Sequence, residues 1–204
     1  MKLHWSPKSP FVRKVMIVAH ECALVDRIEL IRSVAAMRTP NPALMADNPL
    51  NKIPTLRLAD GTVLYDSTVI CEYFIDLSGR HSLLPRNGSE RWSALRRNAL
   101  GNGLLDALIL WRNERERAQP SAELIAAFET KTRASLAQLH VDLSAAPTDR
   151  FDIGDIAMGC ALAYLDFRFS DFNWRQLQPT LATWFERFSA RTSVQATRIV
   201  DDTP

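Results

Sequence analysis

The chain has 204 residues, of which 47% are hydrophobic and 24% charged, as expected for a folded protein of one large or two small domains. Its formal net charge of +2 argues against an extended surface for nucleic acid. The start has no apolar signal-peptide core, and the apolar stretch 104–110 is too short to span a bilayer, so we expect a cytoplasmic protein without membrane contact.

Cysteine and histidine residues do not form a recognisable pattern in this sequence. Three cysteines (Cys22, Cys71 and Cys160) are an odd number at wide spacing, and the four histidines are equally scattered. Neither a disulfide framework nor a zinc site has such spacing. We therefore expect reduced cysteines and no bound metal.

The first third of the chain alternates strand and helix signals. Leu3 and Trp5 alternate with polar neighbours, which predicts a short first strand. Ser9-Pro10 predicts the start of a helix, because serine caps helices and proline suits their first position. A second strand is expected over residues 25–31, followed by an irregular segment, 37–49, with three prolines.

A hairpin and a helix complete this first part. Residues 55–58 and 62–65 flank Ala59-Asp60-Gly61, and Asp-Gly is a strong hairpin signal. Asp66 and Ser67 then provide the start signals of a helix that Ser78-Gly79 ends.

Strand signals are nearly absent after residue 88. Residues 81–88 are typical of a linker, and helices are expected over 92–117, over 122–143, after Asp152 and around 181–189. The order βαβ, then ββα, then helices alone predicts two unlike domains. We expect an α/β domain over residues 1–80 and an all-helical domain over residues 89–204.

This order of elements and four local motifs resemble the glutathione S-transferase family. Residues 9–14 (SPFVRK) are similar to the active-site turn of its serine-type bacterial members, and residues 48–56 (NPLNKIPTL) to the segment leading into a cis-proline. Residues 65–70 (YDSTVI) are similar to its acidic-Ser turn, and residues 152–157 (DIGDIA) to the capping box of its central helix. The resemblance runs to about residue 190 and implies a thioredoxin-like glutathione-binding domain followed by a helical domain that contributes the electrophile site.

Three residues depart from the family pattern. Asn51 stands where glycine is common, Asp66 replaces glutamate, and Asp152 replaces serine or threonine. Aspartate also caps helices well, so the last change preserves the expected helix start.

The resemblance implies that Ser9 is the catalytic residue and that Phe11, beside it, also contacts glutathione. A free thiol titrates near 8.5, so conjugation needs a group that favours the thiolate. A hydroxyl donor and a helix N-terminus both do so. The alternative is that Ser9 only caps its helix, and Ser6 is a competing candidate in the same loop.

The remaining residues implied to bind glutathione are Lys52, Ile53, Pro54, Asp66 and Ser67. A cis Ile53-Pro54 bond would leave the Ile53 main chain free to pair with the cysteinyl backbone; the alternative is an ordinary trans proline at a strand edge. Asp66 and Ser67 suit the γ-glutamyl ammonium and carboxylate, although the same atoms would also serve as a helix cap. Lys52 and Arg38 are both candidates for the glycine carboxylate.

The resemblance implies a homodimeric transferase with a role in detoxification, which activates the glutathione thiol for attack on a small hydrophobic electrophile. The alternatives are a non-catalytic glutathione-binding or regulatory protein, or another glutathione-dependent enzyme such as a dehalogenase, isomerase or peroxidase. Glutaredoxin-type chemistry is disfavoured, because no cysteine opens the helix that starts at Ser9-Pro10. Trp5, Phe11, Trp111 and residues 164–169 could line the electrophile pocket or belong to the core, and we leave them unassigned.

Overall fold

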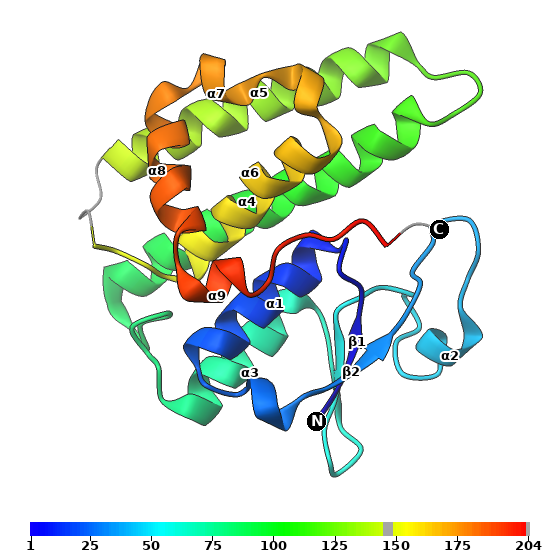
Figure 1. The fold of residues 1–204 in the computed structure, drawn as a ribbon, viewed down its shortest axis with the longest axis vertical. Coiled ribbons are helices and arrows are strands. Elements are labelled where there is room, and N and C mark those ends of the chain that lie inside the picture. Colours follow the sequence, from blue (N-terminus) through cyan, green and yellow to red (C-terminus); the bar gives the residue numbers. More distant parts are fainter. Residues whose placement is uncertain (145–148, 203–204) are drawn as a thin grey trace. The chain divides into compact units, whose positions relative to one another are not determined.

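The computed structural model describes residues 1–144 and 149–202, which form two compact units (Figure 1). The first unit joins residues 1–84 to the segment from Thr192 onward, and the second contains residues 85–191. We expected residues 89–204 to form one helical domain, but the structure places the last of them in the first unit. The reason is that the short helix α9 (Thr192–Gln195) packs on α1 (Pro10–Glu21), the first helix of the chain.

The first unit contains a four-stranded sheet in the order β2-β1-β3-β4. Its strands are β1 (Lys2–Trp5), β2 (Glu29–Arg32), β3 (Thr55–Arg57) and β4 (Val63–Leu64). β1 is parallel to β2 and antiparallel to β3, and β4 is antiparallel to β3. This arrangement confirms the expected α/β domain with βαβ and ββα order.

The second strand begins later than the sequence pattern predicts. We expected a strand over residues 25–31, but Val25–Arg27 form a 3-10 helix, η1, and β2 starts at Glu29. The chain turns here, because the Ile28 N–H donates to the Val25 carbonyl at 3.0 Å. The apolar residues that suggested a strand therefore belong partly to a turn.

Side-chain caps set the starts of the main helices in the first unit, which are α1, α2 (Pro42–Met45) and α3 (Ser67–Ser78). The side chains of Ser9, Asn41 and Asp66 accept hydrogen bonds from main-chain N–H groups in the first turn. α1 packs against α3, and together with the sheet they enclose the core of this unit. Its fully buried members include Leu3, Val15, Ile17, Leu56, Ile70 and Phe74.

Helix α6 forms the centre of the second unit. The helices described in this unit are α4 (Gly88–Arg115), α5 (Ala122–Ser144), α6 (Ile153–Arg168), η2 (Ser170–Phe172), α7 (Trp174–Leu177) and α8 (Pro179–Ser189). Every residue of α6 from Ile153 to Leu165 is buried. α6 packs closely on α4 at Gly101, where a Cβ would lie 2.7 Å from the main-chain carbon of Ala157. The expected all-helical domain is therefore confirmed, with small changes in helix ends.

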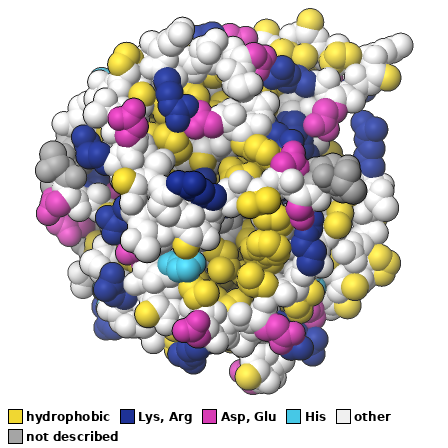
Figure 2. Space-filling model, in the orientation of Figure 1, with side chains coloured by type: hydrophobic (Ala, Val, Ile, Leu, Met, Phe, Trp, Pro, Cys, Tyr) yellow, Lys and Arg dark blue, Asp and Glu magenta, His cyan; other side chains and the backbone are white. Residues whose placement is uncertain are grey.

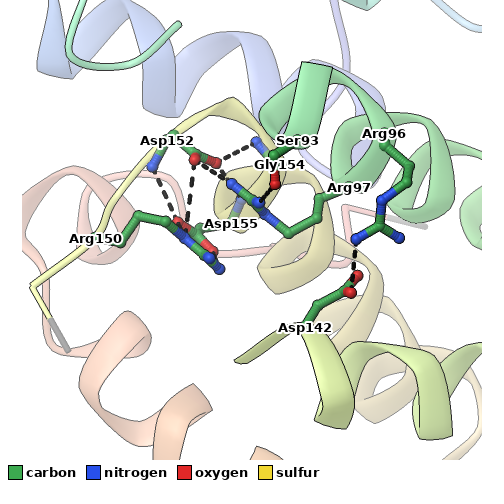
Figure 3. Close-up of polar contacts among 8 residues, drawn as sticks. All are labelled: Ser93, Arg96, Arg97, Asp142, Arg150, Asp152, Gly154 and Asp155. Atoms are coloured by element: carbon green, nitrogen blue, oxygen red, sulfur yellow. Dashed lines mark hydrogen bonds and ion pairs between the residues drawn. The ribbon is translucent and has the colours of Figure 1, made fainter. Parts of the chain in front are cut away.

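A buried polar network fixes the start of α6 (Figure 3). The Asp152 carboxylate accepts hydrogen bonds from the Gly154 and Asp155 N–H groups, and the Asp155 side chain accepts one from the Asp152 N–H. Arg97, on α4, forms an ion pair with Asp152 and donates to Ser93 Oγ at 2.7 Å. Burial raises the pKa of Asp152, the nearby Asp155 adds to this, and Arg97 opposes it. The expected capping box is present, and an arginine from another helix compensates the buried charge.

Charged side chains of both signs are interspersed over the face shown in Figure 2. No helix among the described residues is long and apolar enough to cross a membrane. The three cysteines are buried and form no disulfide in the described part of the chain. Residues 1–144 and 149–202 contain no group of three metal-ligating side chains.

Candidate functional site

The strand register brings the predicted glutathione-binding segments to one edge of the sheet. β1 and β2 are parallel, so the loop after Trp5 and the end of β2 at Arg32 lie at the same edge. Thr55, the first residue of β3, pairs with His4 near the end of β1. β4 leaves the sheet at Leu64, opposite the second residue of β3. Ligands of open α/β sheets characteristically bind at the carboxyl ends of the parallel strands.

Ser9 lies in the loop after β1 and caps α1. Its Oγ accepts a hydrogen bond from the Val12 N–H at 3.3 Å, and the side chain is half-buried. A hydroxyl has one donor as well as two acceptor positions, so this cap leaves the Ser9 O–H able to donate elsewhere. Capping and thiolate stabilisation are therefore compatible roles. Ser6, the competing candidate, is buried, and its carbonyl accepts from the Ser9 N–H at 3.2 Å.

The segment before β3 presents a main-chain pair and a cation. The Ile53-Pro54 bond is cis, as the resemblance implied. In the described part of the chain, neither the N–H nor the C=O of Ile53 has a hydrogen-bond partner. Lys52 is exposed, and its carbonyl accepts from the Asn48 amide at 3.2 Å. The Asn48 amide also donates to Thr55 Oγ1 at 2.9 Å, which ties the segment to the sheet.

The turn before α3 places an acidic group and a hydroxyl at a helix N-terminus. Asp66 is exposed, and its Oδ1 accepts from the Thr68 N–H at 2.9 Å. Ser67 is only 1% exposed, and its Oγ has no hydrogen-bond partner among the described residues. Buried hydroxyl groups are normally paired. A carboxylate bound at this helix N-terminus would supply the partner that Ser67 lacks.

Three further positions belong to the same edge. Phe11 is half-buried on the first turn of α1, and Arg38 is exposed in the loop after β2. Asn51, which replaces the common glycine, adopts a φ of +52°, a region that asparagine tolerates better than most residues. Its side chain accepts from the Asn41 N–H at 3.0 Å and donates to the Ala36 carbonyl at 3.3 Å. Asparagine thus keeps the backbone conformation of the loop and adds a tether that glycine would lack.

Some residues near this edge carried no signal in the sequence. His4, on β1, contacts Ser33 Oγ through Nδ1 at 2.8 Å and Asp47 Oδ2 through Nε2 at 3.0 Å. These bonds connect β1 to the ends of β2 and α2, over separations of 29 and 43 residues. Such contacts have no local sequence pattern, and only the register of the sheet brings the partners together.

The aromatic candidates for the electrophile pocket divide between the two units. Trp5 and Phe11 are half-buried in the first unit. In the second unit, Trp111 and Phe169 are buried with their ring centroids 4.6 Å apart. Tyr164 is also buried, and this burial raises the pKa of its hydroxyl despite the Arg112 guanidinium nearby. Trp111, Tyr164 and Phe169 therefore belong to the core of the second unit, whereas Phe167 is half-buried.

Comparison with known proteins identifies related domains and chains. The chain matches two domain families, "Glutathione S-transferase, N-terminal domain" over residues 8–77 and "Glutathione S-transferase, C-terminal domain" over residues 122–187. It is 32% identical over 204 residues to the uncharacterized GST-like protein YibF of Escherichia coli K12, covering 97% of this chain and 98% of that protein.

Two solved structures extend the comparison. A glutathione transferase family member from Pseudomonas fluorescens Pf-5, with bound glutathione, is 42% identical, covers 98% of each chain and superposes with a TM-score of 0.88. A structure of a family member from the same strain with bound S-(propanoic acid)-glutathione is 40% identical and has a TM-score of 0.89, covering 98% of this chain and 99% of that one. The matches span both units of the structure, and the chain belongs to the glutathione S-transferase family.

Proposed function

We propose that this protein is an enzyme that binds glutathione at the carboxyl edge of its sheet and activates the thiol for attack on a hydrophobic electrophile. The observation that carries the proposal is the convergence at this edge of three groups with unused hydrogen-bonding capacity. These are the Ser9 hydroxyl, the Ile53 main chain and the buried Ser67 hydroxyl.

Glutathione fits these groups from its γ-glutamyl end to its glycine. Ser67 and the N-terminus of α3 suit the γ-glutamyl carboxylate, and the exposed Asp66 suits the ammonium beside it. Ile53 offers one main-chain donor and one acceptor to the cysteinyl residue, next to Pro54. Lys52 and Arg38 are exposed cations for the glycine carboxylate. The bound ligands of the Pseudomonas relatives support this assignment.

The chemistry requires a thiolate held near Ser9. A thiol with a pKa near 8.5 is mostly protonated at neutral pH. The Ser9 O–H would donate a hydrogen bond to the sulfur, and the positive end of α1 favours negative charge there. The thiol proton passes to solvent, and the sulfur then bonds to the electrophilic carbon as the leaving group departs from that carbon with its bonding electron pair. Phe11, beside Ser9 on α1, would cover one side of the sulfur.

A non-catalytic glutathione-binding protein on the same fold is the competing function. Both accounts predict glutathione binding, and only the enzyme accelerates conjugation. Calorimetric titration with glutathione, followed by conjugation of 1-chloro-2,4-dinitrobenzene, separates them. We expect heat of binding and a rate above the uncatalysed reaction. Binding without rate enhancement for this and other electrophiles would support the binding protein, and absence of binding would refute both.

We also propose that the enzyme works in the cytoplasm as a homodimer with a role in detoxification. Its cysteines form no disulfide among the described residues, as is usual in a reducing compartment. Tyr65 and Val69, which lie close to Asp66 and Ser67 in the sequence, are 38% and 46% exposed. Exposed apolar side chains there would be stabilised by burial against a second copy of the chain. Sedimentation at micromolar concentration should give twice 23.0 kDa. A single species of 23.0 kDa would reject the dimer.

A further inference from the structure

The segment that follows α9 lies against the loop that carries Ser9. This segment, the red strap in Figure 1, comprises residues 197–202 and belongs to the same unit as the sheet. The Val200 N–H donates to the Pro7 carbonyl at 3.4 Å. Lys8, the neighbour of Ser9, lies 3.5 Å from an oxygen of Asp201 and 3.1 Å from one of Asp202. The chain thus places carboxylates of its own beside the predicted catalytic loop.

The Asp202 carboxylate lies between two cationic side chains from different elements. Its Oδ1 faces Lys8 Nζ, while its Oδ2 accepts from Arg32 Nη2 at 2.6 Å and from Arg32 Nε at 2.9 Å. Lys8 lies in the loop after β1, and Arg32 is the last residue of the parallel strand β2. Both cations therefore stand at the edge where Ser9 stands, spaced so that one carboxylate contacts both.

The electrostatics of Asp202 are those of a bound carboxylate. Partial burial works against its ionisation, but hydrogen bonds and charge from Lys8 and Arg32 outweigh this and keep the pKa of Asp202 below its ordinary value. The strap is held to this loop by the Val200 hydrogen bond and by these ion pairs. Its side chains are partly exposed, 46% for Asp201 and 30% for Asp202, and exposed ion pairs of this kind contribute little to stability. A competing carboxylate can therefore displace it.

We propose that Lys8 and Arg32 form a carboxylate-binding subsite beside Ser9, which Asp202 fills in the resting protein and an acidic aromatic electrophile takes over during reaction. This inference rests on the proposed function, because it names the class of second substrate for that site. The carboxylate would be anchored by both cations, leaving the ring to reach the sulfur. Asp202 must leave Lys8 and Arg32 before a substrate carboxylate can bind there. Only a substrate that competes for both cations can therefore use the subsite.

A matched pair of electrophiles isolates the carboxylate. In 4-chloro-3,5-dinitrobenzoate the glutathione sulfur attacks the carbon that carries chlorine, a C–S bond forms, and chloride leaves with the C–Cl electron pair. The thiol proton goes to solvent, and the carboxylate on the far side of the ring takes no part in bond changes. The amide, 4-chloro-3,5-dinitrobenzamide, reacts in the same way without the charge. The measured quantity is the ratio of kcat/KM for the acid to kcat/KM for the amide.

We expect Lys8→Met and Arg32→Met each to lower this ratio about tenfold, the effect of losing one charge-assisted hydrogen bond. Asp202→Asn should raise the ratio, because the two cations then lack their internal competitor. Lys2→Met is the matched control, since Lys2 pairs with Glu29 at the start of β1, at the opposite edge of the sheet. It should leave the ratio unchanged. Circular dichroism establishes that each variant is folded.

The outcomes separate this inference from the proposed function. A ratio that is the same in the parent and in all three site variants would overturn the subsite. A rise in the Kd for glutathione in Lys8→Met and Arg32→Met with an unchanged ratio would also overturn it, because the cations would then hold the glycine carboxylate. If neither electrophile reacts, conjugation fails as the function, and calorimetry with unreactive 3,5-dinitrobenzoate and 3,5-dinitrobenzamide decides the subsite. Equal affinities would refute it, and tighter binding of the acid that Lys8→Met abolishes would support it.

Discussion

Removing the hydroxyl of Ser67 should change stability and glutathione affinity in opposite directions. This side chain is 1% exposed and its Oγ has no partner among the described residues. A buried polar group without a partner costs about 1–3 kcal/mol, and alanine also favours a helix more than serine. Ser67→Ala should therefore raise the free energy of unfolding of the ligand-free protein by about 1 kcal/mol.

Glutathione binding should weaken in the same variant. A hydrogen bond from a hydroxyl to a charged group is worth about 1.5–3 kcal/mol, and its loss would raise the Kd about 10- to 150-fold. Urea denaturation measures the free energy of unfolding, and isothermal calorimetry measures the Kd. An ordinary helix cap predicts instead a loss of stability with unchanged affinity.

Ser78, at the other end of α3, supplies the matched control. Its Oγ donates to the Ile75 carbonyl at 3.2 Å and accepts from the Arg80 N–H at 3.3 Å. Ser78→Ala should therefore lower the free energy of unfolding by about 0.5–1.5 kcal/mol and leave the Kd unchanged. If Ser67→Ala loses as much stability as Ser78→Ala and binds glutathione like the parent, the assignment of Ser67 is refuted.

Arg97→Met should lower the free energy of unfolding in urea by about 1–3 kcal/mol, because it removes the hydrogen-bonded cation of the buried Asp152 carboxylate and leaves Arg150, 3.8 Å away, as the remaining one; unchanged stability would contradict this. Asn51→Ala should bind glutathione more weakly by calorimetry than Asn51→Gly, because alanine disfavours a φ of +52°. The Ser121 N–H bond holds the pKa of Glu114 below its ordinary value, so its stabilisation is present above about pH 4.3 and is lost as pH falls through the lowered pKa. When the free energy of unfolding is measured against pH, the parent and Glu114→Gln should therefore differ only above that lowered pKa. Parallel curves over the whole pH range would contradict this role of Glu114.

Local chemistry explains what could be predicted from the sequence. The starts of α1, α3 and α6 were predictable because Ser9, Asp66 and Asp152 satisfy N–H groups only two or three residues away. The strand expected over 25–31 failed because apolar alternation does not distinguish a strand from a turn with apolar residues. The placement of Ser67 and Ile53 came from the family resemblance, since their spacing alone also fits simple caps and turns.

Long-range pairing explains what the sequence left hidden. Asp152 was predictable as a cap, but its partner Arg97 lies 55 residues earlier on another helix. The segment after residue 191 returns to the first unit, where Arg32 meets Asp202 across 170 residues. No local sequence pattern predicts such long-range contacts. The predicted helical domain therefore included residues that the structure places in the first unit, and no local sequence pattern indicates that Arg32 lies near Lys8.

The most direct test of the account is the ultraviolet absorbance of the glutathione thiolate, measured against pH in complexes with the parent and with Ser9→Ala. In the parent, bound glutathione should ionise with a pKa below that of a free thiol, which is about 8.5. In Ser9→Ala the pKa of the bound thiol should rise by about one unit, because about 1.4 kcal/mol of thiolate stabilisation is lost. The Kd for glutathione should change little. Superimposable titration curves would contradict the account and leave Ser9 as a helix cap alone.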